Sequence, residues 1–242
     1  MKLKLVAWKC WRELRTKFWM STALIVLHAS FLVGFFWHVK SGAGLLSITE
    51  SDAHALQDLT GNYLTFLSET WAGSGMMLML AVLLSTGGVN HEQKTGTLGV
   101  TLGLPVKPET WVFTQTALSF SLVLVLVLLS GVLIFAGGLL IGASILTGPV
   151  FFSTALMALA GMGSAGVTVA VTARCERAST TIMIAAGIVL LLGLFPSGWN
   201  IWTDAQRLLE VGSWPIGMIT ICISAMLLGP MFAARRFATL DH

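Results

Sequence analysis

Charged residues are scarce in this 242-residue chain: Asp, Glu, Lys and Arg make up 10% of it, whereas hydrophobic residues make up 55% and the mean hydropathy is +0.84. Soluble domains carry about 25% charged residues. A water-soluble globule of this composition would aggregate, so we expect lipid to be the solvent for most of the chain. The net charge of +3 is too small and too thinly spread to predict a nucleic-acid surface.

Other absences exclude further classes of protein. The three cysteines, Cys10, Cys175 and Cys222, form no CxxC pair and are predicted to be unpaired thiols in cytoplasmic or intramembrane positions. No GxxxxGK[ST] sequence occurs, so the chain is not expected to bind nucleotide phosphates or to be an enzyme. The basic N-terminus is followed by no small-residue cleavage site, which predicts a retained first span.

Six stretches of the chain are long, apolar and free of Asp, Glu, Lys and Arg. A helix needs about 20 such residues to cross the hydrocarbon core of a bilayer. The stretches are Phe18 to Trp37, Ala72 to Val89, Thr110 to Ile141, Pro149 to Ala173, Ser179 to Trp199 and Trp214 to Ala234. The sequence therefore predicts an all-α integral membrane protein with six transmembrane helices, forming a single domain over residues 1–242.

The first 17 residues have a different pattern. Leu3, Val6, Ala7, Cys10 and Leu14 recur at helical spacing, and Lys and Arg fill much of the rest. This pattern predicts an amphipathic helix that lies in the membrane interface and leads into the first span.

Basic residues are distributed unequally between the loops. Twelve of the fourteen Lys and Arg fall in residues 1–17, the second loop, the fourth loop and the C-terminal tail; the exceptions are Lys40 and Arg207. Because basic loops stay in the cytoplasm, both termini are predicted to be cytoplasmic and the long loop over residues 39–70 external.

The second loop carries a motif, NHEQKTGTLGVTLGLPVKPETW. It resembles the signature of ABC type-2 permeases, in which a Glu, three residues, Gly-Thr-Leu, an apolar helical stretch and Pro-Val precede the third span. The matching positions here are Glu92, Gly96, Thr97, Leu98, Leu102, Pro105 and Val106. Gly99 and Gln115 stand where an acidic residue and a Lys are common in the family, so docking contacts are expected to differ in detail.

The resemblance implies a function and partners. In that family this segment is the coupling helix, which docks into a groove on a separate nucleotide-binding subunit. The implied protein is the permease subunit of an ABC exporter in a bacterial inner membrane. It would pair with an identical or similar permease and bind two ATPase subunits, which would hold the ATP and Mg²⁺; no cofactor is expected in this chain. Gln115 and Ser119, at i and i+4 in the third span, either line a translocation path or seal a helix contact.

Two other functions are disfavoured by the residues within the spans. Ser164 lies in a Gly-Ser-Ala-Gly sequence, but the only histidine after it is His242 in the tail, and no Lys or Asp lies within the spans to supply the base that a serine protease needs. Gly161, Gly163, Ala165 and Gly166 are therefore predicted to form a small-residue helix contact. An ion-coupled transporter usually has ionisable groups at membrane depth. His28 is the lone candidate, and a hydrogen bond between helices is the expected role for it.

Metal transport is the remaining alternative from the residues. Met76, Met77 and Met79 offer thioethers that suit copper, and His38 and His54 lie outside the spans, but their spacing makes no ligand set, so packing is the expected role for these methionines. A haem-exporter-like permease of similar architecture and a non-transporting membrane scaffold or immunity protein are the alternative functions.

Overall fold

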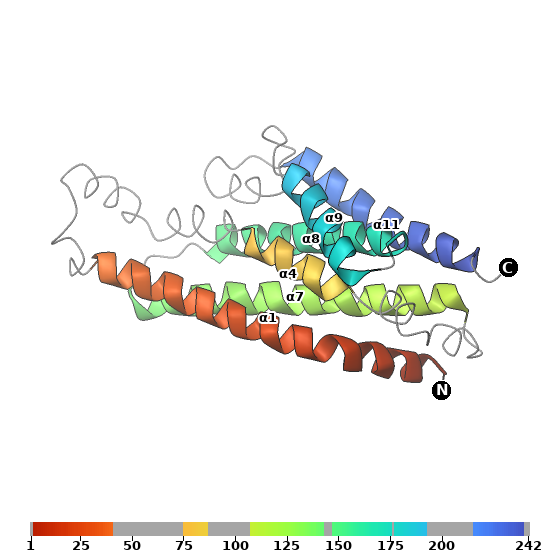
Figure 1. Ribbon diagram of the computed structural model, residues 1–242. Coiled ribbons are helices and arrows are strands. Elements are labelled where there is room, and N and C mark those ends of the chain that lie inside the picture. Colours follow the sequence, from red (N-terminus) through yellow and green to blue (C-terminus); the bar gives the residue numbers. More distant parts are fainter. Residues whose placement is uncertain are drawn as a thin grey trace.

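The computed structural model describes residues 2–40, 75–86, 107–142, 147–175, 177–192 and 215–239. All regular structure within these ranges is helical. The helices are α1 (Lys2–Lys40), α4 (Met76–Ser85), α7 (Pro108–Leu140), α8 (Thr147–Thr172), α9 (Ala178–Leu192) and α11 (Ile216–Ala238). Successive helices run in alternating directions between the two ends of a bundle (Figure 1).

Four of these helices contain segments long and apolar enough to cross a membrane. The segments are Val6–His38 in α1, Glu109–Leu140 in α7, Phe151–Thr172 in α8 and Ile216–Ala238 in α11. The chain is therefore an all-α, multi-pass membrane protein. Helix α4, in the expected second span, has 10 residues, and helix α9, in the expected fifth span, has 15. Residues 72–74, 87–89 and 193–199 of these two expected spans lie outside the described ranges.

The helix boundaries follow from local chemistry. Pro108 is the first residue of α7. Its missing N–H costs nothing there, because the first N–H groups of a helix have no partner within the helix, and its fixed φ suits a helix. Glu109 places a negative charge in the first turn, where it stabilises the helix dipole. At the other end, Gly142 has a φ of 66° and its N–H donates to the carbonyl of Leu139 at 3.1 Å. A left-handed glycine of this kind stops a helix. The predicted span from Thr110 to Ile141 is confirmed as a helix with nearly these bounds.

Helix α1 runs without a break through the predicted boundary near residue 17. No Gly or Pro occurs before Gly34 to interrupt it. One buried stripe continues along the whole helix: Val6, Cys10, Leu14, Ser21, Ile25, Ala29, Leu32 and Phe36. At 1.5 Å per residue, 39 residues extend about 58 Å, nearly twice the roughly 30 Å of a hydrocarbon core. The basic N-terminal part is thus the beginning of the same helix, and its apolar face packs on protein.

Helix α8 occupies the centre of the bundle. It packs against α4, α7, α9 and, most extensively, α11, whereas α1 packs chiefly against α7 (Figure 1). The contact between α8 and α11 depends on glycine, because a Cβ at Gly166 would overlap the carbonyl of Ala225 and one at Gly229 would overlap the carbonyl of Gly166. A Cβ at Gly163 would lie 3.0 Å from the Cα of Cys222. The predicted small-residue helix contact is confirmed.

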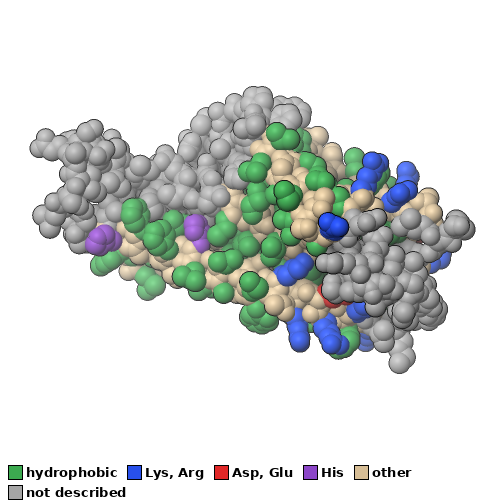
Figure 2. All heavy atoms as spheres, in the orientation of Figure 1, with side chains coloured by type: hydrophobic (Ala, Val, Ile, Leu, Met, Phe, Trp, Pro, Cys, Tyr) green, Lys and Arg blue, Asp and Glu red, His purple; other side chains and the backbone are tan. Residues whose placement is uncertain are grey.

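Lys and Arg side chains gather at one end of the molecule. Figure 2 shows them at the end where Figure 1 places both termini, over the N-terminal half of α1 and the adjoining ends of the other helices. Away from that end, the visible, described surface carries hydrophobic side chains interspersed with backbone and other side chains, including His (Figure 2). We call this end, where α1 and α7 begin and α8 and α11 end, the basic end; the Lys and Arg residues in or beside these helix ends are Lys4, Arg12, Lys107, Arg174 and Arg235.

Candidate functional site

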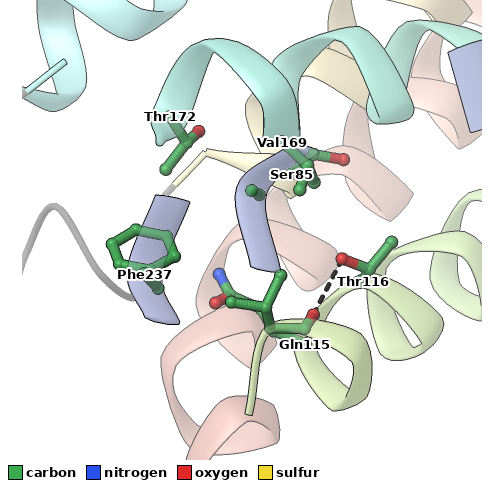
Figure 3. Close-up of a pocket in the computed structure, with 8 residues that line it drawn as sticks. Ser85, Gln115, Thr116, Val169, Thr172 and Phe237 are labelled. Carbon is green, nitrogen blue, oxygen red and sulfur yellow. Dashed lines mark hydrogen bonds between the residues drawn. The ribbon is translucent and has the colours of Figure 1, made fainter. Parts of the chain in front are cut away.

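A small cavity lies where four helices converge near the basic end. It has a volume of about 20 Å³, close to the space that one water molecule needs. Helices α4, α7, α8 and α11 each contribute residues to its wall, which consists of Ser85, Val112, Gln115, Thr116, Val169, Thr172, Ala233 and Phe237 (Figure 3). Four of these residues are polar, although most of the surface that lines the space is apolar.

The hydroxyl groups of the cavity differ in how they are satisfied. Thr116 Oγ1 donates to the carbonyl of Val112 at 2.8 Å, the bond dashed in Figure 3, and Thr172 Oγ1 donates to the carbonyl of Thr168 at 2.8 Å. Ser85 is 1% exposed, and its Oγ has no hydrogen-bond partner among the described residues. A buried hydroxyl without a partner is costly in a low-dielectric interior, so Ser85 is the exceptional group of this cavity.

The two residues predicted to share a face of the third span do so. Gln115 is 9% exposed and Ser119 is 1% exposed, and both face the interior of the bundle. Ser119 Oγ donates to the carbonyl of Leu84 at 3.5 Å, so it joins α7 to α4, while Gln115 lines the cavity. Their use in a translocation path stays a prediction.

A lysine connects α1 to the C-terminal end of α4. Lys17 Nζ donates to the carbonyl of Thr86 and, at 3.4 Å, to that of Leu83. The last carbonyls of a helix have no partner within it and carry partial negative charge, so a cation there is stabilising. Thr86 itself ends α4 in an extended conformation, with its hydroxyl donating to the carbonyl of Val82 at 2.6 Å. Lys17 therefore fixes the last turn of α4 from a neighbouring helix.

The residues predicted for coupling to an ATPase lie outside the described residues. These are Glu92, Gly96, Thr97, Leu98, Leu102, Pro105 and Val106. The described chain stops at Thr86 and resumes at Lys107, which precedes Pro108 at the start of α7. Both flanking residues are near the basic end. Thr86 accepts a hydrogen bond from Lys17 of α1, and Lys107 is one of the basic residues at that end.

The residues of the disfavoured alternatives have ordinary packing roles. Ser164 is buried and donates to the carbonyl of Ala160 at 3.0 Å, within its own helix. Met77 belongs to the apolar core that α1, α4, α7 and α8 share, Met76 packs against this core and Met79 against the neighbouring one, as predicted. His28 Nε2 is buried without a partner in the described part of the chain, so the expected interhelical hydrogen bond is not made by that nitrogen.

Sequence reasoning missed two members of this region. From the sequence alone, Lys17 was used only as one of the basic residues that predict orientation. Lys17 lies at the border between the charged and the apolar parts of α1, and this position indicates a lysine with a long apolar stem that can reach a polar group on a neighbouring helix. Ser85 follows a run of apolar residues in α4, and nothing in that run distinguished it as a functional candidate. A hydroxyl in such a run is ordinary, because it usually bonds to its own helix, and Ser85 does not.

No known protein-family model matches this chain, and no curated protein is significantly similar to it in sequence.

Proposed function

We propose that this chain is the membrane-spanning permease subunit of an ABC transporter, an exporter driven by ATP hydrolysis on a separate nucleotide-binding subunit. The observation that carries the proposal is the position of the segment that resembles a coupling helix. It connects α4 to α7, and the residues on both sides of it, Thr86 and Lys107, lie near the basic end.

The orientation of the protein follows from its charges under this proposal. Short basic loops remain in the cytoplasm, so the basic end is the cytoplasmic end and both termini are inside. The segment 87–106 then meets the compartment that holds ATP. The apolar residues that adjoin α4 and α9 complete the second and fifth of six spans, and six alternating spans return the C-terminus to the side of the N-terminus.

The proposed assembly contains two permease subunits and two ATPase subunits in a bacterial inner membrane. ATP and Mg²⁺ are bound by the ATPase subunits, because this chain has no phosphate-binding loop. The permease transmits movement of its coupling segment to the helices that the segment connects. Lys17 supports this role, because it ties α1 to the very end of α4 from which the segment leaves.

The coupling segment provides the test of this proposal. Leu98→Asp combined with Leu102→Asp removes two apolar contacts, each worth about 1.5 to 3 kcal/mol, and places charges in the docking groove. We expect the affinity for the ATPase subunit to fall about 100-fold or more, with loss of stimulated ATP hydrolysis. The measurement is co-purification with the candidate ATPase subunit at matched permease expression.

The matched control is Leu45→Asp combined with Leu46→Asp, in the loop predicted to be external. It adds the same charge and removes the same two leucines, and it should leave the ATPase bound. If the Leu98/Leu102 variant retains its partner and full activity, the segment is not a coupling element and the alternative of a non-transporting membrane scaffold gains support.

A further inference from the structure

The N-terminal part of α1 carries an exposed face that takes no part in the packing of the bundle. Its members are Trp8, Arg12, Arg15 and Trp19, which follow one another at intervals of four, three and four residues and therefore share one side of the helix. We call these four residues the arginine face. We propose that the arginine face binds the phosphate of an anionic phospholipid in the leaflet at the basic end, independently of the transport function.

The arginine face lies opposite the side of α1 that packs on protein. Trp8 is 61% exposed and Trp19 is 63% exposed, and both arginines are exposed as well. Residues two apart in a helix point about 200° away from each other. The buried stripe of the same segment, which is Val6, Cys10 and Leu14, therefore points into the bundle while the arginine face points away from it.

The depth of this face in the membrane follows from the length of the apolar part of α1. Residues 18–37 carry no charge and extend about 30 Å, which matches the thickness of the hydrocarbon core. Along the helix axis, Arg15 and Arg12 lie about 4.5 and about 9 Å outside this apolar part. The lipid headgroups occupy this zone, and the long side chain of arginine can bring its guanidinium to their phosphates.

The neighbouring helix supports this depth. A Cβ at Gly137 of α7 would overlap the side chain of Val33 of α1, and at the basic end Val6 and Trp111 belong to one buried cluster. The two helices are therefore antiparallel neighbours along their length, and the uncharged turns of α7 around Trp111 are level with the arginine face. Phe113 in these turns is 47% exposed. An exposed phenylalanine beside exposed arginines fits the level at which acyl chains meet headgroups.

Two arginines at i and i+3 suit the phosphate of a lipid. Their side chains are neighbours on the helix surface, and each guanidinium can donate two parallel N–H bonds to phosphate oxygens. The only acidic residue of α1 is Glu13, which is half-buried and outside the arginine face. The face therefore favours a lipid with a net negative charge, such as phosphatidylglycerol, over phosphatidylcholine, whose headgroup brings its own cation.

The two tryptophans complete the site in different ways. The guanidinium of Arg12 lies 5.7 Å from the centre of the Trp8 ring, a cation–π contact that fixes its direction and keeps its N–H edge available to a phosphate. Trp19 lies one turn from Arg15 on the membrane side, where indole rings pack on the glycerol and the upper acyl chain. Trp8 is thus a positioning residue, and Trp19 contacts the apolar part of the lipid.

Native mass spectrometry of the full chain tests the binding of lipid. The protein is released from neutral detergent micelles that contain increasing phosphatidylglycerol or phosphatidylcholine, and the masses give the Kd of the tightest bound lipid. Each arginine near the surface contributes about 5-fold to the affinity for anionic lipid. Arg12→Gln combined with Arg15→Gln should therefore weaken phosphatidylglycerol binding about 10-fold or more, and phosphatidylcholine binding less than about 2-fold. Unchanged phosphatidylglycerol binding, or an equal loss for both lipids, overturns the proposal.

The matched control is Arg174→Gln combined with Arg177→Gln. These arginines are also exposed and three residues apart, but they lie between α8 and α9 and not on one helix. The control removes the same two charges, and it should weaken phosphatidylglycerol binding less than about 2-fold, because salt screens charges that lie far from the lipid. A loss equal to that of the Arg12/Arg15 variant would show a general attraction to basic residues and overturns the proposal.

Glycerol 3-phosphate distinguishes a lipid from a free phosphate. It has the phosphate without acyl chains, so it should not bind at concentrations at which phosphatidylglycerol saturates the site; equal binding overturns the lipid assignment. Thermal unfolding in the same micelles checks the fold. Without lipid, the Arg12/Arg15 variant should keep the Tm of the wild type, because both side chains are exposed. Phosphatidylglycerol should raise the Tm of the wild type more than that of the variant, and an equal rise overturns the proposal.

Trp8→Leu isolates the positioning role of Trp8. It keeps an apolar side chain but removes the cation–π contact with Arg12, so it should weaken phosphatidylglycerol binding about 2- to 5-fold. In a chain that already carries Arg12→Gln, the same substitution should have no further effect, because the residue on which Trp8 acts is gone. An equal loss in both backgrounds overturns the positioning role.

Discussion

The most apolar segments of helices α1 and α8 are almost equally hydrophobic, but the two helices occupy opposite positions in the bundle. Their most apolar windows have mean hydropathies of 1.7 and 1.6, yet 22% of the first is buried in the protein and 67% of the second. The difference lies in the size of the side chains. Helix α1 exposes large residues such as Trp19, Leu27 and Phe31, whereas α8 carries small ones such as Gly163, Ala165 and Gly166 where its neighbours approach. Hydropathy indicates that a helix enters the membrane, and residue size indicates where it lies within the bundle.

This contrast has a physical cause. Lipid tails are as apolar as leucine, so burying a large side chain against another helix gains little over leaving it in lipid. Close approach of two backbones gains dispersion contacts along the whole interface, and only small residues allow it. Substitutions at a close helix contact and substitutions on a lipid-facing surface should therefore have very different effects on stability.

The largest effect is expected from Gly166→Ala. The added Cβ would overlap the carbonyl of Ala225 on α11, which is backbone and cannot rotate away. The two helices must separate, and we expect a loss of about 3 kcal/mol or more, at the upper end of overpacking effects. Thermal unfolding in detergent measures it.

Gly34→Ala in α1 is the matched control. A Cβ at Gly34 would meet nothing within 4 Å, so the change removes only the flexibility of glycine in a helix. We expect it to be neutral or to stabilise by about 0.5 to 1 kcal/mol. Equal destabilisation by both alanines would mean that α8 and α11 are not in backbone contact.

A smaller effect is expected where α1 does make a specific polar contact. Lys17→Met retains the long apolar stem but removes the charged donor from the carbonyls of Leu83 and Thr86. Hydrogen bonds from a charged group to a helix end are worth about 1 to 2 kcal/mol in partly buried settings. We expect a loss of that size, together with faster proteolysis near residue 87.

Arg15→Met is the charge-matched comparison for this substitution. Arg15 lies two residues earlier in α1 and is exposed, so its replacement should change stability by less than about 0.5 kcal/mol. If both substitutions give the same small change, Lys17 does not hold the end of α4.

The features that could be predicted from sequence are those that depend on neighbouring residues. A charge-free run from Pro149 to Ala173 predicted α8 to within two residues of its observed bounds, because lipid tolerates no charge there. The spacing of Gly163 and Gly166 predicted a close helix contact, and the spacing of Gln115 and Ser119 predicted a shared buried face. Each of these follows from the 3.6-residue period of a helix.

The features that could not be predicted depend on which helices meet. Lys17 and Thr86 are separated by 69 residues, and no local pattern reveals that the lysine reaches a carbonyl of α4. The cavity has the same origin, since Ser85, Thr116 and Thr172 come together only when three helices converge. The unbroken path of α1 was missed for another reason: a change from charged to apolar residues marks a change of solvent, and a helix can pass through it without bending.

The smallest effect on stability is expected from a substitution on the lipid-facing side of α1. This substitution tests most directly the contrast between the exposed helix α1 and the buried helix α8. Leu27 is 69% exposed, whereas Ile25, two residues earlier on the same helix, is 1% exposed and belongs to the core that α1 shares with α4, α7 and α8. Leu27→Ala exchanges contacts with lipid for other contacts with lipid, so we expect it to change stability by less than about 0.5 kcal/mol. Ile25→Ala leaves a cavity between packed helices and should cost about 2 to 5 kcal/mol. Thermal unfolding in lipid nanodiscs compares the two variants, because nanodiscs keep lipid on the exposed face of α1. A loss at Leu27 as large as that at Ile25 would show that another protein surface covers this face of α1, and the contrast between α1 and α8 would then hold only for the isolated chain.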